Sequence, residues 1–483
     1  MDKSQTVFSN LIWRFMERCG SQVVSFVVSI VLARLLEPEL YGTIALVTVI
    51  TSILQVFVDS GMANALIQKK DTDDLDYSSV FYFNVAFCLI LYLGLFLAAP
   101  MISRLYKHPE LVPVIRVLGL TIVVSGVKNV QQAYVSKTMQ FRRFFFSTLG
   151  GTIFSAIVGI TMACKGFGIW ALVMQQLLNV AVNTAILWLT VGWKPKAVFS
   201  LERLGGLISY GWKILASALL DTVYLKLYQL VVGLKYTESD LAFFNKGDQL
   251  CVLVVENINA SIDSVLLPVL SSEQDNRDSV REMTRRAVKT SSYIMMPIMA
   301  GMAVCATPLI RLLLTEKWLP CVPYLQVFCC AYALYPLHTA NLNAIKAMGR
   351  SDIFLKQEII KKILVTVLIL ATMGISPFAI ALSEVISGVL SLLVNAWPNR
   401  RLLGYYYPRL FRDVLPAMLA SVAMAACVWP VSLLGLSDIL TLLIQVPLGV
   451  AVYVAISMIF RIDSFTYVLN AAKKLISRGR AAA

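Results

Sequence analysis

The sequence predicts an all-α, polytopic membrane protein, and three observations carry that prediction. Of its 483 residues, 58% are hydrophobic and only 14% are charged, whereas a soluble domain carries about 25% charged residues. The apolar residues fall into about fourteen segments of roughly 20 residues or more, the length that crosses a bilayer as a helix. Lys and Arg also alternate between the connectors in the manner that fixes membrane orientation.

The predicted membrane helices follow one another closely and account for nearly the whole chain. Several end at or near Pro or Gly, whereas Pro297 and Pro447 lie inside segments and predict kinks. The segments are expected at about residues 11–36, 42–66, 78–100, 111–135, 144–164, 168–192, 206–234, 240–268, 287–314, 321–345, 354–375, 377–398, 411–434 and 438–460.

Basic residues predict the topology. If the N-terminus is cytoplasmic, most Lys and Arg fall on cytoplasmic connectors and tails. One helix more or fewer would invert every later connector, so we expect an even number of helices and both termini in the cytoplasm. The predicted cytoplasmic set includes Lys69, Lys70, Lys137, Arg142, Arg143, Lys194, Lys196, Arg203, Arg277, Arg281, Arg285, Arg286, Lys289, Lys346, Arg350, Lys356, Arg400, Arg401, Arg409 and Arg412.

A faint internal repeat predicts the domain organisation. Three pairs of short segments recur in the same order: Trp13-Arg14 with Trp212-Lys213, Asp59-Ser60 with Asp263-Ser264, and residues 113–117 with 323–327. Two six-helix lobes of the same orientation would produce this pattern. We therefore expect an N-terminal lobe at 1–200, a C-terminal lobe at 201–405, and two further helices with a cytoplasmic tail at 406–483.

Composition and motifs argue against several other classes of protein. The net charge of +14 fits orientation of a membrane protein better than nucleic-acid binding, since no single basic patch with interleaved aromatic residues is present. None of the nine cysteines forms a C-x-x-C pair, and the two histidines, His108 and His338, do not suggest a metal site. No nucleotide-binding or nucleophile motif occurs, so we expect neither an enzyme nor a bound cofactor.

Polar residues nevertheless line one face of several predicted membrane helices. A charged side chain at the centre of a bilayer costs about 2.5–3.5 kcal/mol on insertion scales, so it should face a cavity or a partner. We therefore expect a water-filled cavity, with interhelical hydrogen bonding as the alternative; for Glu17, an ion pair with Arg14 or Arg18 is an equal alternative. The polar faces comprise Arg14, Arg18, Gln22, Ser25 and Ser29 in the first helix; Lys213, Ser217, Asp221, Tyr224 and Tyr228 in the seventh; Asn245, Gln249, Glu256, Asn259 and Asp263 in the eighth, with Asp248 adjacent; Ser125, Asn129, Gln132 and Ser136 in the fourth; and Glu384, Ser387, Ser391 and Asn395 in the twelfth.

Three motifs then suggest a family. Residues 33–42 read A-R-L-L-E-P-E-L-Y-G, residues 57–68 read F-V-D-S-G-M-A-N-A-L-I-Q, and residues 265–274 read V-L-L-P-V-L-S-S-E-Q. Together they resemble the Wzx-type polysaccharide transporters, of the colanic-acid and teichuronic-acid kind, in the multidrug/oligosaccharidyl-lipid/polysaccharide flippase superfamily. The pattern covers about residues 10–400. It departs from the family at residues 244–249, F-N-K-G-D-Q, where Y-N-x-A-Y is frequent.

The resemblance implies a flippase that moves undecaprenyl-pyrophosphate-linked oligosaccharide across the bacterial inner membrane, by alternating access through a central cationic cavity. Without an ATP site, the substrate gradient or Na⁺ or H⁺ would drive it, and a polysaccharide polymerase is a possible partner. Two alternatives stay open: a drug or cation exporter of the same superfamily, and a membrane scaffold for polysaccharide polymerisation. The expected substrate contacts are Arg14, Arg18, Lys213, Tyr224, Tyr228, Gln22 and Asn259, and the expected ion-coupling residues are Glu17, Asp59, Asp221, Glu256 and Asp263.

Overall fold

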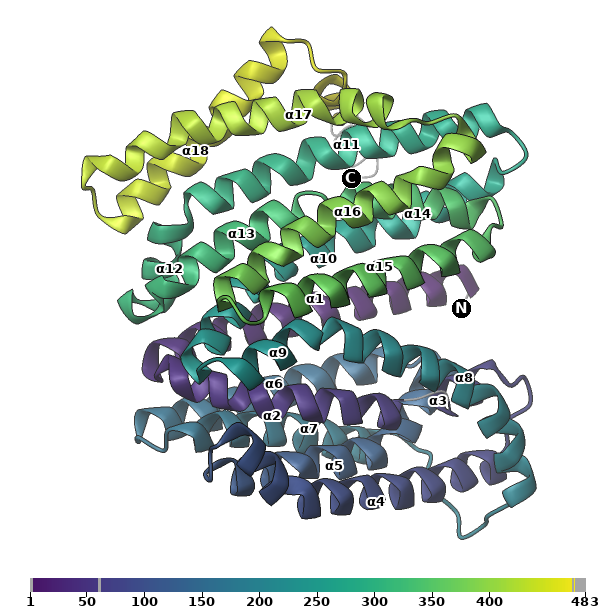
Figure 1. Cartoon of the computed structure of the whole chain (residues 1–483). Helices are drawn as coiled ribbons and strands as arrows, with labels where there is room; N and C mark the ends of the chain where they lie inside the picture. The colour runs from purple at the N-terminus through teal and green to yellow at the C-terminus, as the bar shows by residue number, and fades with distance from the viewer. Residues whose placement is uncertain (1–2, 60–61, 471–472, 474–483) are drawn as a thin grey trace. The chain divides into compact units, whose positions relative to one another are not determined.

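Helices make up all of the regular structure in the described part of the chain. The computed structural model describes residues 3–59, 62–470 and 473. Within these ranges the chain forms helices joined by short connectors, with no strand (Figure 1). The all-α, multi-pass fold class expected from the composition is therefore confirmed.

The chain divides into two compact units, residues 1–242 and 243–483. In the first unit, the helix pairs that pack together most extensively are α6 with α7, α4 with α5, and α1 with α6. The helices of this unit are α1 (Lys3–Leu35), α2 (Pro38–Asp59), α3 (Met62–Gln68), α4 (Asp74–Tyr106), α5 (Leu111–Lys137), α6 (Phe141–Cys164), α7 (Ile169–Thr190), α8 (Leu201–Leu225) and α9 (Leu227–Lys235).

Glycines allow the helices of the first unit to approach closely. A Cβ on Gly151 of α6 would lie 2.8 Å from the carbonyl oxygen of Asn179 in α7, and a Cβ on Gly126 of α5 would lie 2.6 Å from the sulfur of Cys88 in α4. Because lipid tails are as apolar as leucine, close packing and interhelical hydrogen bonds hold membrane helices together. The amide of Asn84 in α4 donates one such bond, 3.1 Å to the carbonyl of Gly126.

The second unit has its own core between α11, α14, α16, α17 and α18, with Val288, Leu337 and Leu392 among its buried side chains. Buried hydroxyls add to it: Tyr293 of α11 donates to Ser457 of α18 at 2.8 Å. The elements of this unit are α10 (Glu238–Ser272), α11 (Arg277–Val304), α12 (Ala306–Leu314), η1 (Glu316–Cys321), α13 (Val322–Tyr332), α14 (Tyr335–Ala347), α15 (Ser351–Thr372), α16 (Pro377–Leu403), α17 (Tyr407–Val428), η2 (Trp429–Leu434) and α18 (Asp438–Ile459).

Two of the predicted spans are broken helices. The seventh is bent by 45° between α8 and α9, and the ninth by 69° between α11 and α12. Pro297 and Pro447, where kinks were expected, lie inside α11 and α18, and both helices continue past them. Broken helices are tolerated at membrane depth where neighbouring helices or a cavity satisfy the freed backbone groups.

Helix length and hydropathy set a lower limit on the number of membrane spans in the described residues. Eleven helical stretches in the described residues are long and apolar enough to cross a membrane, and thirteen if each bent pair counts as one span. The eleventh predicted segment, residues 354–375, corresponds to α15, which carries Lys356, Glu358, Lys361 and Lys362 in its first half. Every predicted segment therefore coincides with helix, and fourteen spans stays a prediction.

The compact units divide later in the chain than the proposed lobes. The repeat suggested a boundary after residue 200, whereas the units separate between Ala242 and Phe243, within the first turns of α10. The reason is packing: α8 contacts α2, α3 and α4, and α9 contacts α2 and α4. Helices α8 and α9 thus belong to the first unit by contact, although the repeat assigned them to the second lobe.

Candidate functional site

The N-terminal half of the polar face on α1 is tied to α6. The Arg14 guanidinium lies 2.6 Å from a carboxylate oxygen of Glu17, and its Cζ lies 5.1 Å from the centre of the Phe144 ring. The Thr148 hydroxyl donates to the other Glu17 oxygen at 3.2 Å. The ion pair that the sequence left open as an alternative for Glu17 is therefore present, and it joins two helices of the first unit.

Arg18 differs from Arg14 in its surroundings. It lies one turn further along α1, its side chain is exposed, and among the described residues no carboxylate lies within ion-pair distance of it. Ser25, two turns later on the same face, is also exposed, and Gln22 between them is half-buried. A guanidinium has five N–H donors in a planar fork, so Arg18 has donors available for an anion.

The polar face of the seventh predicted span is carried by two helices. Lys213, Ser217 and Asp221 are exposed at four-residue intervals along α8, a spacing that places them on one side of the helix. The chain then bends by 45° between α8 and α9. Tyr224 lies before this bend and Tyr228 after it, both half-buried. Tyr224 therefore keeps the helical spacing from Lys213 and Asp221, whereas spacing alone no longer places Tyr228 on that face.

The polar face of α10 in the second unit is partly satisfied by α14. The Thr339 hydroxyl donates to the side-chain oxygen of Asn259 at 2.9 Å, and the Asn343 amide donates to Asp263 at 2.8 Å. Glu256, between one and two turns before Asp263, is exposed. Asn259 and Asp263 thus bond across helices, as the interhelical alternative expected, and whether this face lines a cavity stays a prediction. The side chain of Asp59, the remaining predicted ion-coupling residue, lies outside those the structure describes.

One polar contact within the membrane-spanning part of the second unit was not among the predicted site residues. The Tyr332 hydroxyl of α13 donates to Asp248 of α10 at 2.7 Å, and the Glu384 carboxylate of α16 interacts electrostatically with Asp248. The sequence placed Asp248 beside the polar face of the eighth predicted helix and Glu384 on that of the twelfth, and a phenol in an apolar segment is the signal for Tyr332. Three helices of the second unit thus bring two carboxylates and a phenol together.

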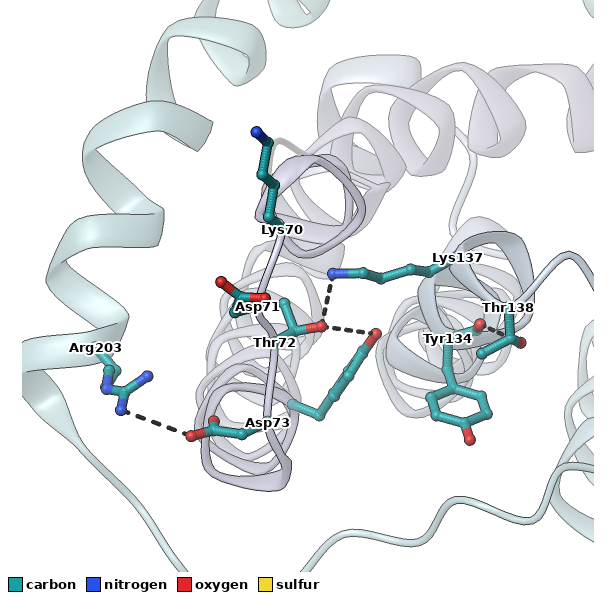
Figure 2. Close-up of a pocket in the computed structure, with 9 residues that line it drawn as sticks. Lys70, Asp71, Thr72, Asp73, Tyr134, Lys137, Thr138 and Arg203 are labelled. Carbon is teal, nitrogen blue, oxygen red and sulfur yellow. Dashed lines mark hydrogen bonds and ion pairs between the residues drawn. The ribbon is translucent and has the colours of Figure 1, made fainter.

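A cavity of about 600 Å³ lies in the first unit, at the connector between α3 and α4. Figure 2 shows Lys137 of α5 directed at Thr72, and Arg203 of α8 directed at Asp73. The Lys137 amine bonds the Thr72 hydroxyl at 2.6 Å and the carbonyls of Leu66 and Lys69. The protein itself therefore accepts from all three N–H donors of the Lys137 amine, so Lys137 has no donor left for a ligand in this cavity.

The same connector also begins α4. Asp73 caps the helix, accepting from the backbone N–H of Asp76 at 2.9 Å, while Asp76 accepts from the backbone of Asp73. This backbone hydrogen bond, with the positive charge of Arg203, holds the pKa of Asp73 below its usual value. Arg203, which the sequence placed on a different cytoplasmic connector, thus stabilises the start of α4 and its junction with α8.

Comparison with known proteins identifies the family to which these features belong. Residues 31–323 match the family described as "Polysaccharide biosynthesis protein". The chain is a member of the polysaccharide biosynthesis protein family. The match covers more than half of the chain and includes all three motifs from which the resemblance was inferred.

Relatives of this polysaccharide biosynthesis protein serve several different polymers. It is 22% identical to the succinoglycan biosynthesis transport protein ExoT of Rhizobium meliloti, over 75% of this chain and 74% of the relative. It is 25% identical to the lipopolysaccharide biosynthesis protein WzxC of Escherichia coli, over 69% and 68%. It is 23% identical to the teichuronic acid biosynthesis protein TuaB of Bacillus subtilis, over 79% and 80%.

The fold of this family member is that of known transporters. The lipid II flippase MurJ, in an inward closed conformation, aligns with a TM-score of 0.75 at 16% identity, over 94% of this chain and 99% of that one. An inward-facing multidrug transporter of the MATE family aligns with a TM-score of 0.62 at 16% identity, over 79% and 94%. The likeness to these two solved transporters shows a shared fold, and the first of the relatives above is named as a transport protein.

Proposed function

We propose that this polysaccharide biosynthesis protein is a flippase for undecaprenyl-pyrophosphate-linked oligosaccharide units, moving them from the cytoplasmic to the periplasmic leaflet of a bacterial inner membrane. The observation that carries the proposal is the set of relatives, whose names place them in three different polysaccharide pathways. What such pathways share is a lipid-linked precursor rather than a sugar. The likeness of the fold to that of MurJ, a lipid flippase by name, supports the same reading.

Arg18 and Lys213 are the proposed contacts to the pyrophosphate. Both are exposed cations on helices of the first unit, within segments that are otherwise strongly apolar. Arg18 would bind a phosphate through two N–H groups, and Lys213 would act as a point charge. Arg14 is already paired with Glu17. Its effect on the anion would therefore be indirect, through Arg18 and through the local electrostatic potential. Tyr224 and Tyr228 are proposed to stack on sugar rings, with Gln22 and Asn259 as polar contacts.

Coupling to Na⁺ or H⁺ is proposed through carboxylates of these same faces. Asp221 and Glu256 are exposed, and Asp263 accepts a hydrogen bond from Asn343 while keeping its second oxygen for a cation. Glu17 is the weakest of the predicted coupling residues, because both of its oxygens already have partners. Both termini are proposed to be cytoplasmic; reporter fusions after residue 483 and near residue 107 should then report opposite sides of the membrane.

The proposal is tested by reconstituting the full chain in liposomes and following the flipping of a defined pyrophosphate-linked oligosaccharide. Arg18→Ala and Lys213→Ala should each reduce the initial rate by about ten-fold or more, since each removes a charged hydrogen bond worth about 1.5–3 kcal/mol. Lys356→Ala removes an exposed cation of α15 and should leave the rate unchanged. Full flipping by a stable Arg18→Ala/Lys213→Ala protein would reject the pyrophosphate contacts.

A second function, export of a cationic compound, is favoured by one observation. The MATE transporter shares the fold, and the exposed Asp221 and Glu256 would suit a cation better than a pyrophosphate. The same liposomes separate the two functions when they are loaded with a cationic dye. Dye efflux that depends on Asp221 or Glu256, without oligosaccharide flipping, would replace the flippase proposal.

A further inference from the structure

An excess of arginine gathers where three helices of the second unit end together. Helix α16 finishes with Arg400 and Arg401, Gly404 closes it in the left-handed conformation at φ +64°, and α17 begins three residues later. Helix α11 begins at Arg277 beside this end. We define the arginine cluster as Arg277, Arg281, Arg400, Arg401, Arg409 and Arg412.

Contacts hold the cluster around the end of α16. Arg277 donates to the carbonyl of Arg401 at 2.6 Å, and Arg409 donates to the carbonyl of Gly404 at 3.4 Å. A Cβ on Gly404 would lie 3.9 Å from a guanidinium nitrogen of Arg281. Carbonyls at a helix C-terminus carry partial negative charge and attract cations, which explains why these side chains converge there.

The helix end balances only a small part of this positive charge. Among the described residues, the one carboxylate in ion-pair contact with the cluster is the exposed Asp278, 3.0 Å from Arg281. Further along α11 the situation is the opposite, because Arg285 binds Asp413 with two bonds of 2.9 Å and Lys289 lies 3.5 Å from the same carboxylate. Arg285 and Lys289 are thus matched by acids of the protein, whereas among the described residues the cluster has one such acid.

Exposed aromatic rings mark the depth of the cluster in the membrane. Trp397 lies one turn before Arg400 on α16, and Tyr406 and Phe411 flank Arg409 and Arg412 at the start of α17; all three rings are exposed. Tryptophan and tyrosine concentrate at the level of the lipid headgroups. Arginines just beyond such rings, at the ends of membrane-spanning helices, lie where lipid phosphates lie.

We infer that the arginine cluster is a binding site for an anionic glycerophospholipid, with the lipid phosphate held by guanidinium groups and the acyl chains against the exposed rings. Within the described part of the chain, the contacts above leave several N–H donors of each guanidinium without a partner, and the fork of an arginine matches two oxygens of one phosphate. Bound phosphate would offset the mutual repulsion of the arginines. It would also fix the ends of α11, α16 and α17 relative to one another, independently of what the protein transports.

Native mass spectrometry of the full-length protein in detergent tests the inference, with phosphatidylglycerol, phosphatidylcholine and inorganic phosphate titrated separately. We expect bound phosphatidylglycerol, clearly weaker phosphatidylcholine, and affinity that falls as salt rises. Arg400→Gln with Arg412→Gln removes two exposed cations that make no contact with the protein in the described residues, so folding should be unaffected. Because each basic residue near an anionic surface contributes roughly five-fold in affinity, this pair should weaken phosphatidylglycerol by about ten-fold or more.

The matched control is Lys346→Gln with Lys356→Gln, which removes two exposed cations elsewhere in the second unit and should change the affinity by less than about two-fold. A third variant, Arg277→Lys with Arg409→Lys, keeps the charge and loses the planar fork, and should bind with intermediate affinity. Equal losses in the cluster and control variants would overturn the inference, because net charge alone would then explain binding. Equal affinity for the two lipids, or competition by inorganic phosphate at millimolar concentration with no preference for lipid, would overturn it as well.

Discussion

His108 and Glu238 form an ion pair between the turn that joins α4 to α5 and the first residue of α10. The backbone of Glu238 also packs directly on Gly42, near the start of α2. Three segments that lie far apart in the sequence therefore meet at one end of the first unit. Both contacts hold the α9–α10 turn against α2 and the α4–α5 turn.

The electrostatic contribution of the His108–Glu238 pair to local stability should be small. His108 is nearly half exposed and Glu238 about one-fifth exposed, and exposed ion pairs contribute about 0.2–1 kcal/mol. Replacing His108 with Gln should therefore raise the rate of hydrogen exchange at residues 236–241 only a few-fold. Glu238→Gln should have the same effect, and the double variant should add nothing further. Additive effects in the double variant would mean that the two side chains do not act on each other.

The steric part of the contact should be strong. A Cβ on Gly42 would lie 1.8 Å from the carbonyl oxygen of Glu238, a distance at which backbone must shift. We expect Gly42→Ala to separate the α9–α10 turn from α2, to increase hydrogen exchange at residues 236–241 far more than His108→Gln does, and to lower thermal stability. Gly94→Ala is the matched control, because a Cβ on Gly94 of α4 would meet nothing within 4 Å. Equal behaviour of the two alanine variants would show that α2 and the turn do not pack as described.

Hydropathy and charge alternation predicted helix positions well, because each span must satisfy its own backbone hydrogen bonds inside the membrane. Helix α15 shows where this reasoning is weakest, since Lys361 and Lys362 lower its hydropathy although it forms a regular helix. The breaks after Leu225 and Val304 had no strong sequence signal, because neither follows a proline. Such breaks are decided by packing of the surrounding helices.

Spacing identified the polar faces but not the partners of their residues. Arg14 and Arg18 look equivalent in the sequence, and only the position of Thr148 on α6, 131 residues after Glu17, distinguishes them. Asn259 and Asp263 are bonded by α14 for the same reason. The units divide at residue 242 rather than 200 because α8 contacts helices of the first unit, and a sequence repeat carries no information about such contacts.

Water should reach the polar faces and not the lipid-facing ones. Single cysteines at Ser25 and Ser217, both exposed, should react quickly with a membrane-impermeant polar thiol reagent in a background without native cysteines. Asn259 should react more slowly, because Thr339 bonds it. Val28, which by spacing alone would be taken as lipid-facing, is buried in the structure and is unsuitable as a control. Leu97 of α4, which is 77% exposed, is the better one. Labelling of Leu97→Cys as fast as Ser25→Cys would contradict a cavity.

Two buried cysteines of the second unit should cross-link. The sulfurs of Cys251 in α10 and Cys329 in α13 lie 3.5 Å apart, close enough for a disulfide after a small movement. Mild oxidation with a membrane-permeant oxidant should join them, and a peptide map by mass spectrometry should show that pair. Cys330, the next residue along α13, is exposed and should not join Cys251. A bond from Cys251 to Cys330 would contradict the structure, because Cys330 rather than Cys329 would then lie on the side of α13 that faces α10.

The ion pair of Arg285 with Asp413 should be the most costly to break in the second unit. The Asp413 carboxylate is only 4% exposed, receives two bonds of 2.9 Å from Arg285, and accepts a third from Tyr405 at 2.9 Å. Asp413→Asn leaves the guanidinium without its counter-charge, and removal of one partner of a buried pair costs about 3–5 kcal/mol. Since Arg285 is partly exposed, we expect the lower end of this range, seen as a fall of several degrees in the thermal unfolding temperature in detergent.

Two further variants decide whether burial is the cause of that loss. Asp413→Leu combined with Arg285→Met should recover most of the stability, because no charge is then left buried without a partner. Arg350 and Asp352 form a pair with the same two-bond geometry, at 2.9 Å each, on the exposed surface. Asp352→Asn should therefore leave the unfolding temperature unchanged. If Asp352→Asn lowered the unfolding temperature as much as Asp413→Asn does, the geometry of the pair rather than its removal from solvent would set its contribution to stability. The Asp413→Leu/Arg285→Met variant would then fail to recover the lost stability.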